Sequence, residues 1–463
     1  MRTVTRLTSL VLPLCACSEI TGRPARDASM DAVPEASAQD SSAATDRAAR
    51  DTSGEDVEMC PSGTGARLDP RVEVRLDDTG AGTTLGAPAF RIAFVDRQRR
   101  AYLAGACYTC VRGASITAAV WRLNTEGRPE AEYGVGGVGL AVGADAETWF
   151  SGAADLEHRV WVAGLRRGSA VAVARLDAQG RSDDAFNHTA RRSLDGARLG
   201  IGEHFAYGLA IDETGATIVG GNVITSHGPS TAAFALRLTN EGALDMDFAN
   251  GHSLVWSDLH GCFDVARDGD RWVLGCVSED DRPALLRLDA GGRRVRWANS
   301  AEVSVHPAAP RGFQVRALRR DSEGNWVVAG SISRIYSDLA SPPAAVRFSP
   351  DGEPDLRYGG AGIALAAGAR QTFAYTFSSS AHIDCEDRLL LGAAFGGQSG
   401  VVFFDRDGRR MIEVGDEGEL MTPTRGAFFA TTYGVVPGPQ AGTVTILSNY
   451  TSPTATALHR LWL

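Results

Sequence analysis

Residues 209–221 read Leu-Ala-Ile-Asp-Glu-Thr-Gly-Ala-Thr-Ile-Val-Gly-Gly, and this stretch decides the fold. A short apolar run ends at Asp212, a turn signal follows, and a second apolar run ends in two glycines. Asp and Gly between two β-prone runs favour a tight turn, because Asp caps the turn and Gly accepts a positive φ. The stretch therefore predicts a β-hairpin.

The second run of this hairpin recurs along the chain. Equivalent runs end at Gly105, Gly164, Gly221, Gly275, Gly330 and Gly392, and a seventh ends at Ser448. Successive ends are 59, 57, 54, 55, 62 and 56 residues apart. A period of this length indicates a repeat architecture, in which each unit is one supersecondary element.

Each unit contains two further runs. A third run ends in Arg-Leu or a relative of it, a glycine turn follows, and a shorter fourth run completes the unit, as in Arg237-Leu238, Gly242 and 253–256. No helical period is present. Four short strands repeated seven times predict an all-β fold, a seven-bladed β-propeller of four-stranded antiparallel blades over 71–463. A β-solenoid is the alternative, although its coils usually need fewer residues.

The last unit ends after its third strand, and the first is preceded by 72–76, which alternates like a strand. We therefore expect 72–76 to supply the missing fourth strand and close the ring, since closure removes exposed sheet edges.

Residues 1–17 have the composition of an export signal, with two Arg before a short apolar run at 7–14. The run is far too short to span a bilayer. Leu14-Cys15-Ala16-Cys17 resembles a bacterial lipobox, which implies lipid attachment at Cys17, and Ser18 resembles the pattern for sorting to the outer membrane. An ordinary cleaved secretory peptide is the alternative.

Residues 18–70 contain 11 acids, 5 Arg and no aromatic residue. Such a segment cannot bury enough apolar surface to offset its ordering entropy, so we expect a disordered acidic tether. The tether carries a net charge of −6 out of −10 for the whole chain, so the acidity says little about the propeller.

Three segments, 122–139, 237–253 and 347–365, share an Arg-Leu or Arg-Phe start, a Gly turn, an acid, and an aromatic residue. They resemble delta-60 repeats, a bacterial β-propeller family that is often found on secreted or surface proteins. Leu244, Asp245 and Phe248 match well, as do Asp355 and Tyr358. The resemblance implies a fold and no activity, and the matching residues look structural.

The chain has 46 basic residues, all of them Arg, and no Lys. The absence of Lys excludes Schiff-base enzymes, P-loop NTPases and protein kinases. The acidic balance argues against a nucleic-acid partner, because such a protein would show a basic stripe.

With Cys17 lipidated, six cysteines remain in an exported chain, which favours disulfides. Cys262 and Cys276 flank one turn almost symmetrically, so they are a candidate pair across a hairpin. Cys107 and Cys110 are a candidate loop disulfide. The partners of Cys60 and Cys385 are left open.

The loops between second and third strands vary most in length, and all of them should emerge on one face of a propeller. Loops at 106–117, 222–231, 331–343 and 448–456 are therefore a candidate ligand face, with Tyr108, Tyr336 and Tyr450 as contacts. Long loops that are merely tolerated are the alternative.

The sequence shows no nucleophile elbow, no metal-binding spacing of His and no repeated carboxylate in the first strands, so we predict no catalytic residue, metal or cofactor. We expect a monomeric, non-enzymatic binding or scaffold module at the cell envelope, for a protein or glycan ligand. The alternative is an extracytoplasmic lyase or hydrolase with its site in the central channel.

Overall fold

The computed structural model describes the chain in separate ranges. They are 67–75, 88–107, 117–134, 139–140, 147–166, 170–186, 191–194, 203–224, 231–298, 301–332, 341–366, 381–395, 398–423, 430–451 and 454–463. All of them belong to one compact unit, Thr52–Leu463.

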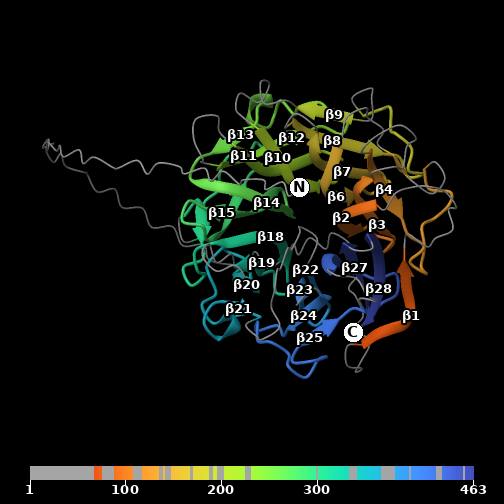
Figure 1. Ribbon diagram of the computed structural model, residues 1–463. Coiled ribbons are helices and arrows are strands. Elements are labelled where there is room, and N and C mark those ends of the chain that lie inside the picture. Colours follow the sequence, from red (N-terminus) through yellow and green to blue (C-terminus); the bar gives the residue numbers. More distant parts are fainter. Residues whose placement is uncertain are drawn as a thin grey trace, which may run out of the picture. The chain divides into compact units, whose positions relative to one another are not determined.

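The described strands form seven four-stranded antiparallel sheets arranged around an axis, so the protein is a seven-bladed β-propeller (Figure 1). Blade 1 holds β2 (Pro88–Val95), β3 (Ala101–Cys107), β4 (Thr117–Arg122) and β5 (Gly139–Leu140). Blade 2 holds β6 (Glu147–Ala154), β7 (Val160–Arg166), β8 (Ala170–Leu176) and β9 (Arg191–Leu194). Blade 3 holds β10 (Glu203–Ile211), β11 (Thr217–Ile224), β12 (Thr231–Leu238) and β13 (Leu254–Trp256).

Blade 4 holds β14 (Leu259–Asp268), β15 (Arg271–Ser278), β16 (Pro283–Leu288) and β17 (Val303–Val305). Blade 5 holds β18 (Phe313–Arg320), β19 (Trp326–Ile332), β20 (Pro343–Phe348) and β21 (Ala364–Leu365). Blade 6 holds β22 (Ala381–Ile383), β23 (Leu389–Phe395), β24 (Gln398–Phe404) and β25 (Glu419–Met421). The described ranges otherwise contain two short 3-10 turns, Ala249–Gly251 and Tyr358–Gly360, and no α-helix.

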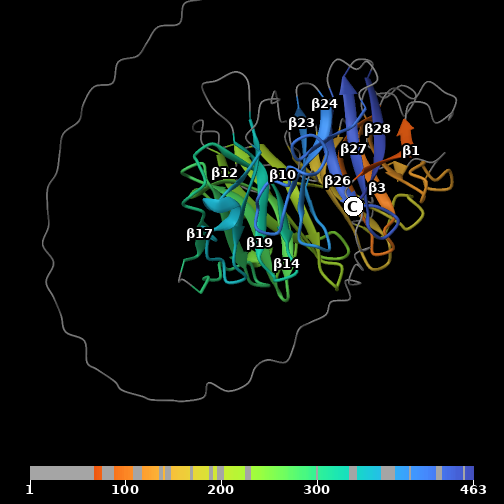
Figure 2. The same cartoon turned by 90° about the horizontal axis from the view of Figure 1, so that it is seen from below.

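Blade 7 joins the two ends of the propeller, because β1 (Arg67–Arg75) pairs with β28 (Thr454–Trp462) beside β27 (Thr443–Thr451) and β26 (Ala430–Pro437). Figure 2 shows β1 alongside β28. β1 covers the segment that the sequence singled out for closure as far as Arg75, and it begins earlier, at Arg67. Residues 67–70, which the composition assigned to the tether, are therefore part of this strand.

The second strand of each blade lies between two others and is buried on both faces, which explains its unbroken apolar run. All seven residues of β19 are buried, as are all seven of β23. Buried strands of this kind lack polar alternation because neither face meets water.

A repeated arginine connects five of the blades to the next. Arg347, at the end of the third strand of blade 5, pairs with Asp355 at 2.7 Å and lies over the Tyr358 ring at 4.8 Å. Its Nη1 also donates to the carbonyl of Arg406, in the turn that follows the third strand of blade 6. Four other arginines donate to the same turn of their next blade: Arg122 to Ala178, Arg175 to Asn240, Arg237 to Ala290 and Arg460 to Thr125.

In five of the turns that follow a third strand, the glycine lies against an aromatic ring of the preceding blade. Gly352 has a φ of +79°, and a Cβ placed on it would collide with the ring of Trp297. Tyr133, Phe186, Phe248 and Tyr358 lie in the same way against Gly180, Gly242, Gly292 and Gly408. The Arg, the turn glycine and the aromatic residue of the repeat thus form one contact between neighbouring blades, so their role is structural.

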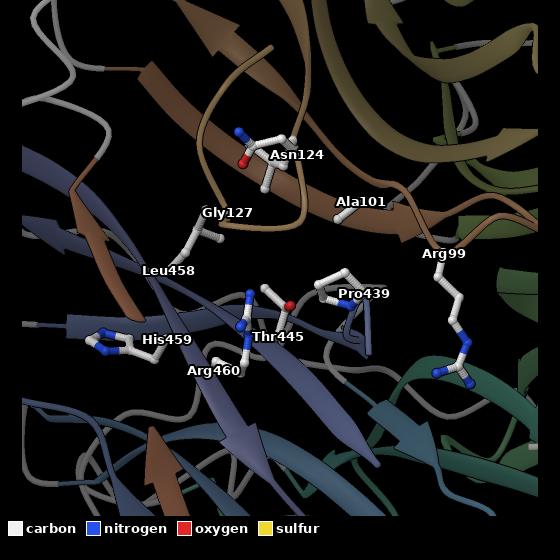
Figure 3. A pocket seen from close by; sticks show the side chains of 10 residues that line it. Arg99, Ala101, Asn124, Gly127, Pro439, Thr445, Leu458, His459 and Arg460 are labelled. Atoms are coloured by element: carbon white, nitrogen blue, oxygen red, sulfur yellow. The ribbon is translucent and has the colours of Figure 1, made fainter. Parts of the chain in front are cut away.

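At the seam between the last and first blades, Arg460 donates in the same way to the carbonyl of Thr125. Figure 3 shows Arg460 of β28 pointing toward the turn after β4, where Asn124 and Gly127 lie. The crevice between them holds about 10 Å³, room for one water molecule at most. It is a packed joint and offers no ligand site.

Candidate functional site

Half of the site residues predicted from the sequence fall outside the described ranges. Cys17, Tyr108, Cys110 and Tyr336 lie outside them. Cys107 ends β3 and Tyr450 lies in β27, where the structure describes the backbone. The candidate ligand contacts of the loops therefore stay predictions.

Cys262 and Cys276 form a disulfide across the first hairpin of blade 4. The two residues are directly opposed in the register of β14 and β15, and both are fully buried. Cys385 is disulfide-bonded as well. The 262–276 bond fixes the backbone immediately before Phe263, which belongs to the feature described next.

The first strand of a blade carries a β-bulge at an equivalent position in six blades. At this position the first strand has one extra residue in its register against the second strand, and the bulged residues are Arg91, Phe150, Tyr207, Phe263, Arg316 and Tyr433. In blade 6 the corresponding position precedes the described part of β22. A bulge turns a side chain away from the alternating pattern of its strand, and bulges are frequent beside binding sites.

Three of these side chains contact one another although they come from three blades. The Tyr207 ring lies 5.3 Å from the Phe150 ring and 5.2 Å from the Phe263 ring, measured between centroids. The Arg316 guanidinium of the next blade lies 5.9 Å from the Phe263 ring. Since equivalent residues of successive blades meet only near the axis, Phe150, Tyr207, Phe263 and Arg316 form an arc along the inner wall of the propeller, which we call the aromatic arc.

A cavity of about 410 Å³ opens beside the aromatic arc between blades 3, 4 and 5, and we call it the mouth cavity. Its wall includes Tyr207, Asn222, Thr231, His260, Phe263 and Arg316. Asn222 lies near the end of a second strand and Thr231 begins the third, so the cavity lies on the side from which the second-to-third loops emerge. Cavities of this size accommodate small ligands.

Two polar atoms of the mouth cavity are buried without a hydrogen-bond partner. They are the side-chain oxygen Oδ1 of Asn222, an acceptor, and Nε of Arg316, a donor. Buried polar atoms in folded proteins nearly always have partners, and an exception calls for an explanation. Both atoms belong to residues that line the mouth cavity, which distinguishes them from buried groups such as the Tyr133 hydroxyl.

Arg316 also carries a charge that no carboxylate balances among the described residues. Its Nη2 donates to Oε1 of Gln314 at 3.0 Å, a neutral partner. Burial lowers the pKa of Arg316, but an arginine remains protonated at any physiological pH. His260 and Asp281 pair with each other at 2.9 Å on another part of the wall.

A second cavity, of about 270 Å³, lies between the first strands of all seven blades and forms the central channel. Asp264 of blade 4 pairs there with Arg319 of blade 5 at 2.8 Å, and Nε of Arg319 donates to the carbonyl of Ala381 in blade 6. Burial raises the pKa of Asp264 against the opposing effect of Arg319. These groups connect three blades and satisfy one another.

Within the described residues, no three His, Cys, Asp or Glu side chains lie close enough to hold a metal ion. The same ranges contain no helix with the length and hydropathy of a membrane span.

Sequence reasoning missed the aromatic arc and the Asp264–Arg319 pair. The bulged residues are 59, 57, 56 and 53 positions apart from Arg91 to Arg316, so an alignment of the units on their first strands would have placed them in register. The alignment could not show the bulge, at which the side chains of neighbouring blades come into contact.

No protein-family model matches the chain, and no curated protein matches it. Solved structures resemble it distantly. The N-terminal domain of Nup159 aligns with a TM-score of 0.42 and 10% identity, over 87% of this chain and 98% of its own. A protein of unknown function from Dyadobacter fermentans DSM 18053 aligns with a TM-score of 0.44 and 10% identity, over 86% and 99%. A chain from an S. cerevisiae complex of Dbp5 with Nup159, Gle1, IP6 and ADP gives 0.41 and 8%, over 87% and 97%. At these values the likeness has no bearing on function.

Proposed function

We propose that this protein is a binding module of the bacterial cell envelope whose ligand occupies the mouth cavity. The observation that carries the proposal is the pair of unpartnered buried atoms, Oδ1 of Asn222 and Nε of Arg316, beside the partly buried rings of Tyr207 and Phe263. Ligand sites combine aromatic walls with a few unpaired polar groups in this way.

The location in the cell is part of the same proposal and rests on the N-terminal sequence. A signal in 1–17 would direct export, Cys17 would carry a lipid, and the acidic segment that follows would hold the propeller away from the outer membrane. Substitution Cys17→Ser should then move the protein from the membrane fraction to the soluble fraction. Unchanged membrane association, with no lipid mass on the N-terminal peptide, would contradict the anchor.

Binding is favoured over catalysis by the state of the charged groups. In the channel, Asp264 and Arg319 are engaged with each other and with backbone groups, so neither is poised to exchange a proton with a substrate. The alternative function, a lyase or hydrolase with its site in the channel, would use Asp264 as the acid, because burial raises its pKa.

The experiment is a screen of the purified propeller against neutral and acidic glycans and against peptides, with product formation followed by mass spectrometry. We expect retention of a ligand without turnover, and loss of that retention in Tyr207→Ala/Phe263→Ala. The conservative Tyr207→Phe is the control for folding and should retain binding. Turnover that Asp264→Asn abolishes would favour the enzyme instead.

A further inference from the structure

The environment of Arg316 can be compared with that of other partly buried arginines in this propeller. Four arginines have side chains that are less than one fifth exposed, and each of them pairs with a carboxylate: Arg122, Arg175, Arg237 and Arg347. The pairing offsets the loss of hydration that a partly buried charge suffers. Arg316 is also partly buried, and its polar neighbour, Gln314, is neutral. Arg287 also has no carboxylate partner among the described residues, but it donates to the carbonyl of Arg296 and lies 4.2 Å from the Trp297 ring. Within the same part of the chain, Arg316 has only the Gln314 side chain as a hydrogen-bond partner and lines the mouth cavity, so an anion in that cavity is the partner that its charge favours.

Asn222, on the same wall of the cavity, requires a hydrogen-bond donor from the ligand in addition to the anion. Oδ1 of Asn222 is buried and unpartnered, and only a donor can satisfy it. A simple carboxylate or a sulfate ion has acceptors alone, so it would satisfy Arg316 and leave Asn222 unpaired. The ligand must therefore carry both a negative group and hydroxyl or amide donors.

The rings of Tyr207 and Phe263 complete the description of the ligand. Both are partly exposed and tilted by 38° to each other, 5.2 Å apart. The aliphatic parts of the wall are buried in the core: Val315 is 0% exposed and Val277 is 7% exposed. The accessible wall thus offers aromatic faces and no aliphatic pocket, which suits the C–H face of a sugar ring better than the apolar side chain of a peptide.

We propose that the mouth cavity binds an acidic saccharide, a glycan of one or two sugar units that includes a uronic acid. Its carboxylate pairs with Arg316, a hydroxyl group donates to Asn222, and a sugar ring lies on Tyr207 and Phe263. His260 and Asp281, which also line this cavity, hydrogen-bond to each other at 2.9 Å. This inference rests on the proposed function and adds the chemistry of the ligand.

The test is calorimetric titration of the complete chain with three probes: digalacturonate, its neutral counterpart digalactose, and a triglutamate peptide. The wild type should bind digalacturonate most tightly, and the affinity should fall as salt is raised. Arg316→Gln should weaken that binding by about tenfold or more, because it removes a charge-assisted hydrogen bond. Asn222→Ala should weaken it for digalacturonate and digalactose alike.

Arg311→Gln is the matched control, because Arg311 lies two residues before β18, the strand that contains Arg316, but is 72% exposed and pairs with Asp280. It should change the affinity by less than about twofold. Equal binding of both sugars, with no effect of Arg316→Gln, would overturn the acidic ligand and leave the binding module standing. Tighter binding of triglutamate would make the site a peptide site and also overturn the inference. If no glycan or peptide binds at all, the proposed function itself fails.

Discussion

At the scale of single residues, the turn glycines of the repeat are fixed by the ring beside them. Gly352 and Gly360 of blade 5 both have positive φ, +79° and +84°, but their surroundings differ. A Cβ on Gly352 would enter the Trp297 ring, whereas a Cβ on Gly360 would meet no atom within 4 Å. The two glycines therefore separate the cost of the backbone conformation from the cost of the contact between blades.

Gly360→Ala should lower the free energy of unfolding by about 1–2 kcal/mol, the cost of a left-handed conformation for an L side chain. Gly352→Ala should lose a further 1–3 kcal/mol or so, because its methyl group displaces the Trp297 ring. Urea denaturation of both variants measures the difference. Equal losses would show that the ring does not determine the choice of glycine.

His306 gives the structure a specific sensitivity to acid. The residue is fully buried and packs edge-on against Phe348, at 5.2 Å between ring centroids. Burial lowers the pKa of His306 to about 4. The unfolded chain binds a proton at His306 below about pH 6.5, whereas the folded protein does so only near pH 4. The free energy of unfolding is therefore highest above pH 6.5 and declines as the pH falls toward 4.

Between pH 6.5 and pH 4, we therefore expect the free energy of unfolding to fall by roughly 3 kcal/mol more in the wild type than in His306→Gln. The measurement is the free energy of unfolding of both proteins across this range. All other titrating groups are common to the pair, so parallel curves would mean that His306 does not titrate as described.

At the scale of elements, the arginine that ends a third strand holds three partners at once. Arg347 pairs with Asp355, lies over Tyr358 and reaches the turn of the next blade. Burial alone would raise the pKa of Asp355, but the hydrogen bond from Arg347 and that from the backbone of Arg357 hold it below its usual range. The sequence motif is therefore a stability device.

Arg347→Met should destabilise the protein by about 2–3 kcal/mol, because Asp355 would lose its charged hydrogen-bond partner. Arg311→Met, at an exposed pair, should cost less than about 0.5 kcal/mol and serves as the comparison. Thermal or urea unfolding distinguishes them. If both variants lose the same amount, the contact between blades does not contribute as described.

Strands and turns could be predicted where the local sequence determines them, whereas features that depend on pairing between strands could not. Hairpins such as the one around Asp212 and Gly215 follow from turn residues and apolar runs, so the seven four-stranded blades could be predicted, and the structure confirms that fold class. The bulges at Tyr207, Phe263 and Arg316 depend on register against the second strand, which no local pattern encodes. The aromatic arc follows from those bulges, so the candidate site was out of reach of a single sequence.

At the scale of the whole molecule, the ring depends on a strand from the beginning of the described chain. β1 pairs with β28 and completes blade 7, so the two ends of the propeller are joined by hydrogen bonds between strands. Without β1, the edge of β28 would present unpaired backbone groups to solvent, a known risk for aggregation.

Deletion of 67–75 should lower the free energy of unfolding by about 3–5 kcal/mol, given roughly 1 kcal/mol for each of the five register pairs that hold β1. It should also promote dimers through the free edge of β28. Deletion of 18–50, which precedes the compact unit, is the control and should leave the melting temperature unchanged. A melting temperature that survives the loss of 67–75 would contradict closure by β1.

The proposed function of the protein depends on one location in the ring, the mouth cavity beside the aromatic arc. The most direct test is a crystal structure of the propeller grown with digalacturonate. We expect electron density for the sugar against Tyr207 and Phe263, with the carboxylate of the sugar paired to Arg316. Density confined to the Asp264–Arg319 channel, or to the outer loops with the mouth cavity holding only solvent, would contradict it.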